Sequence, residues 1–198
     1  MKVIVTRPRA QAQPLVGRLE ALGLDVVECP LIEIVRTSDE PIDCAGYAWA
    51  IVTSPNGADE VARRARNLPK VAAVGPGTAE TLRRHGIEPA FVATVSTAEM
   101  MVAEFPRPEG RVIFLAAENS RRGPIDALGA DFVPLYGTVL LEPEPPPTQA
   151  YARAAPAVSI GPETTKVARS VGLEVAVEAT THDLDGLVAA VAEYARQR

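Results

Sequence analysis

Several short segments of this sequence place a glycine or a hydroxyl-bearing residue between a predicted strand and a predicted helix. The amino termini of helices that follow parallel strands expose unpaired N–H groups, which favour anions such as carboxylates. A small residue at such a point lets a ligand approach the backbone closely. The candidate binding turns are therefore Thr6–Arg7–Pro8, Thr53–Ser54–Pro55–Asn56, Gly75–Pro76–Gly77–Thr78, 117–121 and Gly161–Pro162–Glu163–Thr164.

Arginines in two of these turns suggest a negatively charged ligand. Arg7 follows the first predicted strand, where it can bind a carboxylate or serve as an ordinary surface arginine. Arg121 and Arg122 begin a predicted helix, where the helix macrodipole disfavours positive charge. A bound anion would explain that placement.

The hydroxyl and amide side chains in these turns have a second explanation. Ser54, Asn56, Thr78 and Thr164 can contact a ligand, cap a helix, or do both. We also include the small residues that accompany them in the candidate set, namely Thr6, Gly75, Ser120 and Gly161.

Composition excludes several classes of protein. The net charge of −5 and the lack of a basic cluster argue against nucleic-acid binding. No stretch approaches the roughly 20 apolar residues of a membrane span, and the first residues do not form a signal peptide, so we expect a cytoplasmic protein. With only Cys29, Cys44, His85 and His182 available, we expect no metal site. The glycine turns match neither a phosphate-binding loop nor a dinucleotide fingerprint.

The sequence contains an internal repeat. Residues 71–105 align without a gap on residues 157–191, which pairs Gly75 with Gly161 and Thr78 with Thr164. A looser similarity relates the first 30 or so residues to residues 112–137. Two copies of a unit this long are too few for a solenoid, so they predict two similar lobes facing each other across a cleft.

Strand-like and helix-like segments alternate along the chain, which predicts α/β architecture with parallel sheets flanked by helices. The expected strands are residues 3–6, 26–30, 49–53, 71–74, 90–92, 111–115, 132–135, 139–141, 158–160 and 174–177. The expected helices are residues 11–22, 57–66, 77–85, 96–105, 120–128, 163–171 and 183–196. The fourth of these helices opens with a capping-box spacing, Ser96 to Glu99.

The placement of the repeats predicts how the two lobes form. One lobe runs continuously over residues 38–138, and the other combines residues 1–33 with residues 145–198. The chain crosses between them near residues 34–37 and 139–144, and the proline-rich segment EPEPPP indicates a stiff linker. A double crossing of this kind favours hinge motion.

An ordered set of segments resembles the uroporphyrinogen-III synthase family. The set comprises VTRPRAQAQPLVGRLEALGLDVVECPLIEI, WAIVTSPNGADEV, VAAVGPGTAETLRRHGI, RVIFLAAENSRRGPIDALGADFVPLYGT and SIGPETTKVARSVGLEVAVEATTHDLDGLVAAV. No segment is specific alone, but together they cover most of the chain in the family's order. The resemblance implies two α/β lobes joined by a two-stranded linker.

The resemblance also implies an activity. The family cyclises hydroxymethylbilane, a linear tetrapyrrole with eight carboxylates, with loss of water and inversion of ring D, and it needs no metal or organic cofactor. By this resemblance the partner is a small-molecule polycarboxylate, and we expect a monomer. Tyr136, in LYGT, matches the family tyrosine proposed to donate a proton or a hydrogen bond to the departing hydroxyl, although a tyrosine there can also anchor the linker. Thr164 matches the family's site-facing threonine.

One part of the family pattern is absent. A second copy of the WAIVTSPNGADEV unit belongs between the linker and SIGPET, but only residues 148–157 occupy that space. A buried strand with its helix needs about 25 residues, so roughly 20–30 residues are lacking. Tyr151 and Arg153 are the residues expected to fill part of the gap.

Two other functions fit a two-lobed α/β protein. The first is a non-catalytic module that binds a tetrapyrrole or another polyanion as a sensor or regulator, which the missing unit favours. The second is a solute-binding protein, which the expected lack of an export signal disfavours. Conversion of the linear substrate to the type III product separates catalysis from binding.

Overall fold

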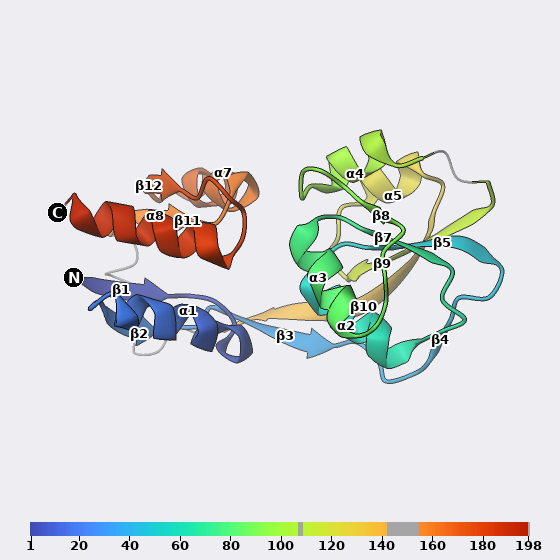
Figure 1. Cartoon of the computed structure of the whole chain (residues 1–198), viewed down its shortest axis with the longest axis horizontal. Helices are drawn as coiled ribbons and strands as arrows, with labels where there is room; N and C mark the ends of the chain where they lie inside the picture. The colour runs from blue at the N-terminus through green and yellow to red at the C-terminus, as the bar shows by residue number, and fades with distance from the viewer. Residues whose placement is uncertain (107–108, 142–154, 198) are drawn as a thin grey trace. The chain divides into compact units, whose positions relative to one another are not determined.

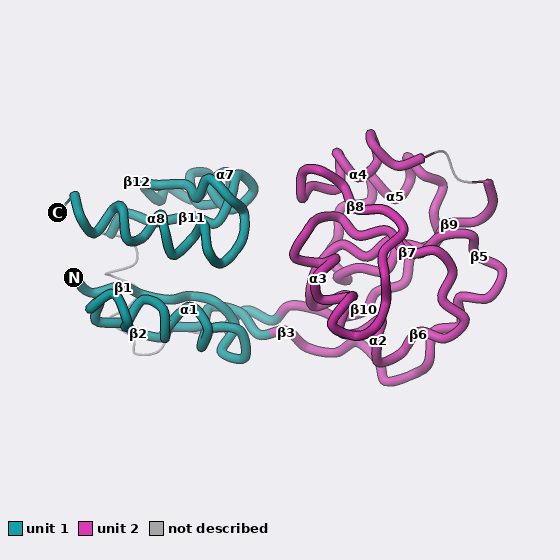
Figure 2. Tube along the Cα trace, in the orientation of Figure 1, with its two compact units in different colours: residues 1–33, 139–198 teal, residues 34–138 magenta. Residues whose placement is uncertain are grey.

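The computed structural model describes residues 1–106, 109–141 and 155–197. These residues form two compact units, shown in different colours in Figure 2. Unit 1 consists of Met1–Glu33 with Val139–Arg198, and unit 2 of Ile34–Thr138. Tyr151 and Arg153, expected to fill the gap, lie outside the described residues. In the part of the chain that the structure describes, no helix is long and apolar enough to cross a membrane.

Unit 2 alternates strands and helices, which confirms the α/β class expected from the sequence. Its strands are β3 (Ile32–Arg36), β4 (Ile42–Asp43), β5 (Tyr47–Val52), β6 (Ala65–Arg66), β7 (Lys70–Ala73), β8 (Phe91–Val92), β9 (Arg111–Ala117) and β10 (Asp131–Leu140). Its helices are α2 (Pro55–Arg64), α3 (Pro76–Arg84), α4 (Ala98–Glu104) and α5 (Arg122–Ala127).

The main sheet of unit 2 has the order β3-β10-β9-β5-β7-β8, and β10, β9, β5, β7 and β8 are parallel. Successive strands move outward from β5 through β7 to β8, and the chain then returns to β9 on the other side of β5. This reversal puts a topological switch point between β5 and β9. Ligands of open α/β sheets bind beside such a point, at the carboxyl ends of the strands.

Helices cover both faces of this sheet (Figure 1), and each face carries an apolar core. On one face α2 and α3 contribute Ala58, Val61 and Leu82, and on the other α4 and α5 contribute Met101 and Ile125. The central strand β5 is apolar on both faces, as a fully covered parallel strand must be, with Ala50 and Val52 in the first core and Ile51 in the second.

Unit 1 is built from both ends of the chain. Its elements are β1 (Lys2–Val5), α1 (Arg9–Ala21), β2 (Asp25–Glu28), β11 (Ala157–Ser159), α7 (Pro162–Ser170), β12 (Val175–Glu178) and α8 (Leu184–Arg196). Here β1 and β2 form one parallel two-stranded sheet, and β11 and β12 form another. A single apolar cluster, with Leu15 and Leu19 of α1 and Leu187 and Val191 of α8, holds them together.

The repeat shows what unit 1 lacks. The segment β7-α3-β8-α4 corresponds to β11-α7-β12-α8, and the looser similarity relates β9-α5-β10 to β1-α1-β2. No described element of unit 1 corresponds to β5 and α2. Within the described residues, no strand joins β1 to β11 as β5 joins β9 to β7.

Two strands carry the chain between the units. β3 and β10 are neighbours in the sheet. The N–H of Leu141 donates to the carbonyl of Leu31 at 2.9 Å, and the Thr37 hydroxyl donates to the carbonyl of Pro134 at 3.1 Å. Because residue 141 pairs with residue 31 and residue 134 with residue 37, the two strands run in opposite directions.

Several details differ from the sequence-based expectations. The expected strands 132–135 and 139–141 are one strand, β10, and the helix expected to end at residue 66 stops at Arg64 because β6 pairs with β4. The prediction of a capping box from Ser96 to Glu99 is wrong. The residue that caps α4 is Thr97, whose hydroxyl accepts the N–H of Met100 at 3.2 Å.

Candidate active site

Tyr136 and Ser54 lie together in unit 2, although they are far apart in the sequence. The Tyr136 hydroxyl is 2.9 Å from Oγ of Ser54, and Ser54 Oγ also accepts the backbone N–H of Gly57 at 3.0 Å. Tyr136 is 7% exposed, so little of the residue reaches solvent. The two candidate residues therefore form one hydrogen-bonded pair rather than two separate sites.

Local sequence explains why Ser54 has this position. Its extended backbone makes it the N-cap of α2, and Pro55 follows at the first helical position, where a missing N–H has no cost. A Cβ at Gly57 would lie 3.2 Å from Ser54 Oγ and 3.6 Å from Leu135 Cδ1. Glycine at this point thus lets the start of α2 approach both the capping serine and β10.

A β-bulge aims Tyr136 at Ser54. The register of β10 against β9 shifts between Pro134, opposite Ala116, and Tyr136, opposite Ala117. As a result Leu135 and Tyr136, which are consecutive, both join the apolar core on the α2 face. Bulges commonly re-aim a side chain beside an active site. Without the extra residue, alternation would point one of these two side chains to the opposite face.

The pair lies at the switch point of the sheet. Tyr136 is level with Ala117, the last residue of β9, and Ser54 follows the end of β5, the neighbour of β9. Glu118, which follows Ala117, was not among the candidate residues predicted from the sequence. The Glu118 N–H donates to the carbonyl of Tyr136 at 2.8 Å, and a Cβ at Gly137 would lie 3.2 Å from Glu118 Oε2. Its position after a buried strand, inside the candidate turn 117–121, is the signal that could have identified it.

The next turn places Gly75 and Thr78 at the start of α3. Gly75 is the N-cap of α3, and a Cβ there would overlap Ser96 Oγ, so the serine side chain already fills the space over this glycine. Thr78 is buried, at 3% exposure, in the first turn. The alternative explanation, that Thr78 and Thr164 cap their helices, is wrong, because both helices begin at glycine without a side-chain cap.

Asn56 and Ser120 occupy the neighbouring turns. Asn56 is half-buried in the first turn of α2, next to Ser54. Ser120 precedes α5, and its N–H donates to the carbonyl of Ala117. Both residues are thus at the same end of the sheet as Tyr136.

Arg121, beside which a bound anion was expected, has a carboxylate partner within unit 2. Arg121 is the N-cap of α5 and makes a two-pronged ion pair with Glu99 of α4, with one N–O distance of 2.8 Å and another of 3.2 Å. Arg122 stacks over the ring of Phe132, with 3.8 Å between its guanidinium carbon and the ring centroid. Both arginines therefore have partners inside unit 2.

Unit 1 holds the remaining candidates. Arg7 is half-buried and forms no hydrogen bond or ion pair with the described residues, and burial lowers the pKa of its guanidinium from the ordinary value. The Thr6 side chain is exposed beyond the end of β1, and its carbonyl accepts the N–H of Leu31. Thr164 is exposed in the first turn of α7. Gly161 caps α7, and a Cβ there would lie 3.1 Å from the ring of His182.

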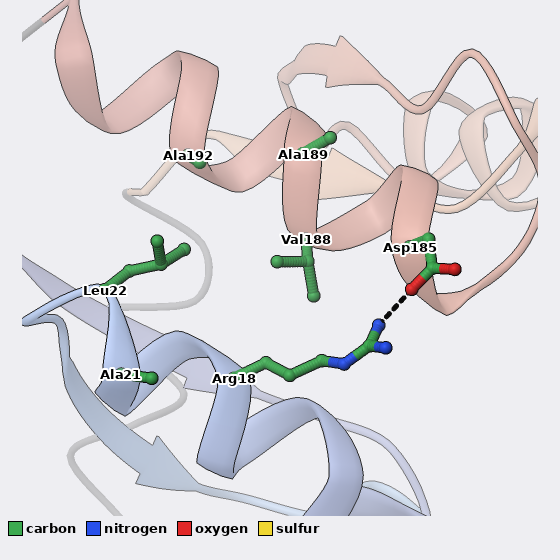
Figure 3. A pocket seen from close by; sticks show the side chains of 7 residues that line it. All are labelled: Arg18, Ala21, Leu22, Asp185, Val188, Ala189 and Ala192. Carbon is green, nitrogen blue, oxygen red and sulfur yellow. Dashed lines mark hydrogen bonds and ion pairs between the residues drawn. The ribbon is translucent and has the colours of Figure 1, made fainter.

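An open hollow in unit 1 lies between α1 and α8, and Figure 3 shows Arg18 and Asp185 meeting across it in an ion pair. Its other lining residues are Ala21, Leu22, Val188, Ala189 and Ala192, so apart from the Arg18–Asp185 pair the hollow is lined by apolar side chains. Among the described residues, no three His, Cys, Asp or Glu side chains gather as metal ligands, and Cys29 and Cys44 are free and buried.

Comparison with known proteins settles the family. A family model described as "Uroporphyrinogen-III synthase HemD" matches residues 13–151, well over half of the chain. The chain belongs to the uroporphyrinogen-III synthase family. Members of this family are lyases that cyclise hydroxymethylbilane.

Individual relatives agree with this assignment. A uroporphyrinogen-III synthase of Synechococcus elongatus is 26% identical over an alignment of 252 positions, which covers 98% of this chain and 96% of the relative. A putative synthase of Methanocaldococcus jannaschii is 28% identical over 155 residues, covering 73% of this chain and 64% of the relative. The synthase of Chlorobaculum parvum is 30% identical over 143 residues, covering 66% and 58%. The matches thus span somewhat under two thirds of the second and third relatives.

Solved structures support the fold. A mutant uroporphyrinogen III synthase of Thermus thermophilus has a TM-score of 0.65 at 13% identity, and the Helicobacter pylori enzyme has 0.60 at 18%; each match covers 100% of both chains. The two-lobed α/β fold expected from the sequence is therefore confirmed. At these identities the likeness concerns the fold alone.

Proposed function

We propose that this chain cyclises hydroxymethylbilane to uroporphyrinogen III, with Tyr136 as the acid that helps the terminal hydroxyl to leave. The observation that carries the proposal is the Tyr136–Ser54 pair, 2.9 Å apart at the switch point of the unit 2 sheet. Ligands of open α/β sheets bind at this place, and a nearly buried phenol there can deliver a proton in a site that excludes most water.

The reaction requires Tyr136 to donate one proton to the substrate and later to receive one back. As Tyr136 gives its proton to the terminal hydroxyl, the C–O bond breaks, water leaves, and the pyrrole nitrogen supplies the electrons that make an azafulvenium-like cation. A ring D carbon attacks this cation through a spiro intermediate, and rearrangement inverts ring D. The pyrrole loses a proton as it regains aromaticity, and this proton restores Tyr136. The net change is the loss of one water.

Binding then has to hold a flexible substrate in the cyclising shape, which is catalysis by proximity and orientation. In unit 2, the first turns of α2 and α3 offer N–H groups beside Ser54 and Gly75. Each such helix terminus favours a carboxylate by about 0.3–1 kcal/mol. In unit 1, the half-buried Arg7 has no described partner, so it can accept a substrate carboxylate without breaking an existing ion pair.

The test is a coupled assay with freshly generated hydroxymethylbilane and chromatographic separation of the type I and type III isomers after oxidation. We expect type III product above the spontaneous type I background. Tyr136→Phe should lower kcat more than tenfold, or more than about 1.4 kcal/mol. The matched control is Tyr47→Phe, which removes a phenol at the opposite end of β5 and should leave kcat unchanged. Full activity of Tyr136→Phe would exclude the acid role.

The described residues of unit 1 form one apolar core, and this favours a second candidate function, a module that binds a tetrapyrrole without turnover. Its described residues lack the counterpart of the β5–α2 unit, which in unit 2 supplies Ser54. The same assay distinguishes the two functions, because a folded chain that binds the substrate but yields only type I product is a binding module. We further propose a cytoplasmic monomer, and light scattering at assay concentration tests the oligomeric state.

A further inference from the structure

We infer that Ser54 is a positioning residue that holds the proton of Tyr136 toward the substrate and connects the phenol to the amino terminus of α2. This inference rests on the proposed function and deepens it. It assigns to Ser54 a role in the chemical step, distinct from capping α2 and from contacting substrate.

The inference begins from the hydrogen bonds that the Ser54 hydroxyl can make. A serine hydroxyl has one proton and two acceptor positions. The N–H of Gly57 occupies one acceptor position at 3.0 Å, and the Tyr136 hydroxyl lies 2.9 Å away. Either Tyr136 donates to Ser54, which turns its proton away from the substrate, or Ser54 donates to Tyr136, which leaves the phenol proton free.

The second arrangement suits an acid. It forms one chain in which Gly57 N–H donates to Ser54 and Ser54 donates to Tyr136, and hydrogen bonds that run in one direction polarise one another. The chain begins at the positive end of α2, a helix of 10 residues. When Tyr136 releases its proton, the negative charge on its oxygen already faces a hydrogen-bond donor, so little reorganisation is needed in the transition state.

The packing around the pair keeps this geometry. Tyr136 is 7% exposed, and its neighbour Leu135 is fully buried against the first turn of α2. The bulge between Pro134 and Tyr136 places both side chains on this face. The phenol therefore has little freedom to swing away from Ser54, and the serine hydroxyl sets the direction of its proton.

The experiment is a double-mutant cycle on kcat and KM for type III formation. Ser54→Ala should lower kcat about tenfold with KM changed less than about twofold, because the lost interaction matters only in the transition state. Ser54→Thr, which keeps a capping hydroxyl, should restore most of kcat. In the Tyr136→Phe background, Ser54→Ala should cause little further loss, because no phenol proton remains to be oriented.

A matched control separates this role from helix capping. Thr97→Ala removes the capping hydroxyl of α4, which bonds the N–H of Met100 and does not touch Tyr136. It should lower thermal stability, although less than Ser54→Ala because Ser54 also bonds the Tyr136 hydroxyl, and it should leave kcat unchanged.

Each contrary result has its own meaning. A rise in KM alone for Ser54→Ala would make Ser54 a substrate contact and overturn the inference. If Ser54→Ala lowers kcat equally in the wild-type and Tyr136→Phe backgrounds, the inference is also overturned, while the proposed function stands. A fully active Tyr136→Phe variant, or a wild-type chain that forms only type I product, would remove the proposed function and this inference together.

Discussion

Unit 2 and unit 1 use the same strand–helix repeat, but they bury it differently. In unit 2, β5 joins β9 to β7 in one sheet with an apolar core on each face. In unit 1, β1 and β11 stay in separate two-stranded sheets, and the described residues contribute one core, between α1 and α8. The difference shows that one strand with its helix both completes the sheet and covers its second face.

The equivalent helices α3 and α7 make the contrast concrete. Thr81 of α3 is 2% exposed, and His85 at the end of α3 pairs with Asp59 of α2 at 2.7 Å. Their counterparts Val167 and Val171 are 61% and 68% exposed. Thus this part of the helix is buried in unit 2, where α3 packs against α2, and exposed in unit 1, where the described residues have no counterpart of α2.

The largest expected effect comes from truncating matched core leucines. Leu82 of α3 and Leu19 of α1 are each at most 1% exposed. We expect Leu82→Ala to cost about 3–5 kcal/mol and Leu19→Ala about 2–3, because a one-sided core relaxes more easily around a cavity. Urea unfolding measures both costs, with Trp49 fluorescence reporting unit 2 and far-UV circular dichroism reporting the whole chain. Equal costs would mean that the two cores are equally rigid.

A second comparison tests whether α7 is truly uncovered. Thr81→Lys should cost about 2–3 kcal/mol, because it places a charge at a position that is 2% exposed. Val167→Lys, at the equivalent position of α7, should change the free energy of unfolding by less than about 0.5 kcal/mol. Thermal denaturation of both variants gives the answer. A large loss for Val167→Lys would show that another part of the protein packs on this helix.

A third comparison concerns the glycines that begin α3 and α7. A Cβ at Gly75 would overlap Ser96 Oγ and lie 2.7 Å from Ser96 Cβ, whereas at Gly161 the nearest atoms, at 3.1 Å, belong to the exposed ring of His182. Gly75→Ala should therefore cost about 1–3 kcal/mol, and Gly161→Ala less than about 1. Urea unfolding measures both, and adding Ser96→Gly to Gly75→Ala should recover part of the loss. Without that recovery, the clash with Ser96 is not the cause.

The smallest expected effect is a pH dependence confined to unit 2. A hydrogen bond from Arg111, followed by one from Tyr47, lowers the pKa of Asp131 below its usual value. A lowered pKa in the folded state stabilises the protein above the unfolded value of about 3.9, and this stability is lost as the pH falls below it. Asp131→Asn should thus flatten the acid loss of stability seen by Trp49 fluorescence between about pH 5 and pH 2. Asp185→Asn, at the exposed Arg18 pair of unit 1, is the control and should leave this profile unchanged.

Sequence reasoning predicted the fold well because the repeat and the buried run of β5 are strong local signals. The predicted helices begin and end within a few residues of the observed ones, since glycines and prolines mark their limits. The short strands β4 and β6 were missed because a two-residue pair leaves no periodic signal. The division of residues 131–140 into two strands failed because a bulge interrupts the alternation that identifies a single strand.

The candidate site was predictable only in part. Family resemblance alone suggested Tyr136, and nothing local to LYGT indicates that its hydroxyl reaches Ser54, because that contact depends on a bulge and on the neighbouring strands. The partner of Arg121 was missed for a similar reason. Glu99 lies one strand and two loops earlier in the chain, and only the packing of α4 against α5 brings the two side chains together.

The discontinuity of unit 1 has a consequence during synthesis. Unit 2 can fold once residues 34–138 have emerged, but β1, α1 and β2 must wait for β11, α7, β12 and α8 to complete their core. At about 5–20 residues per second, translation from Glu33 to the end of the chain takes roughly 10–30 seconds. Throughout that interval Leu15 and Leu19 of α1 have no α8 to cover them, so α1 is translated before unit 2 but is protected from aggregation only after it.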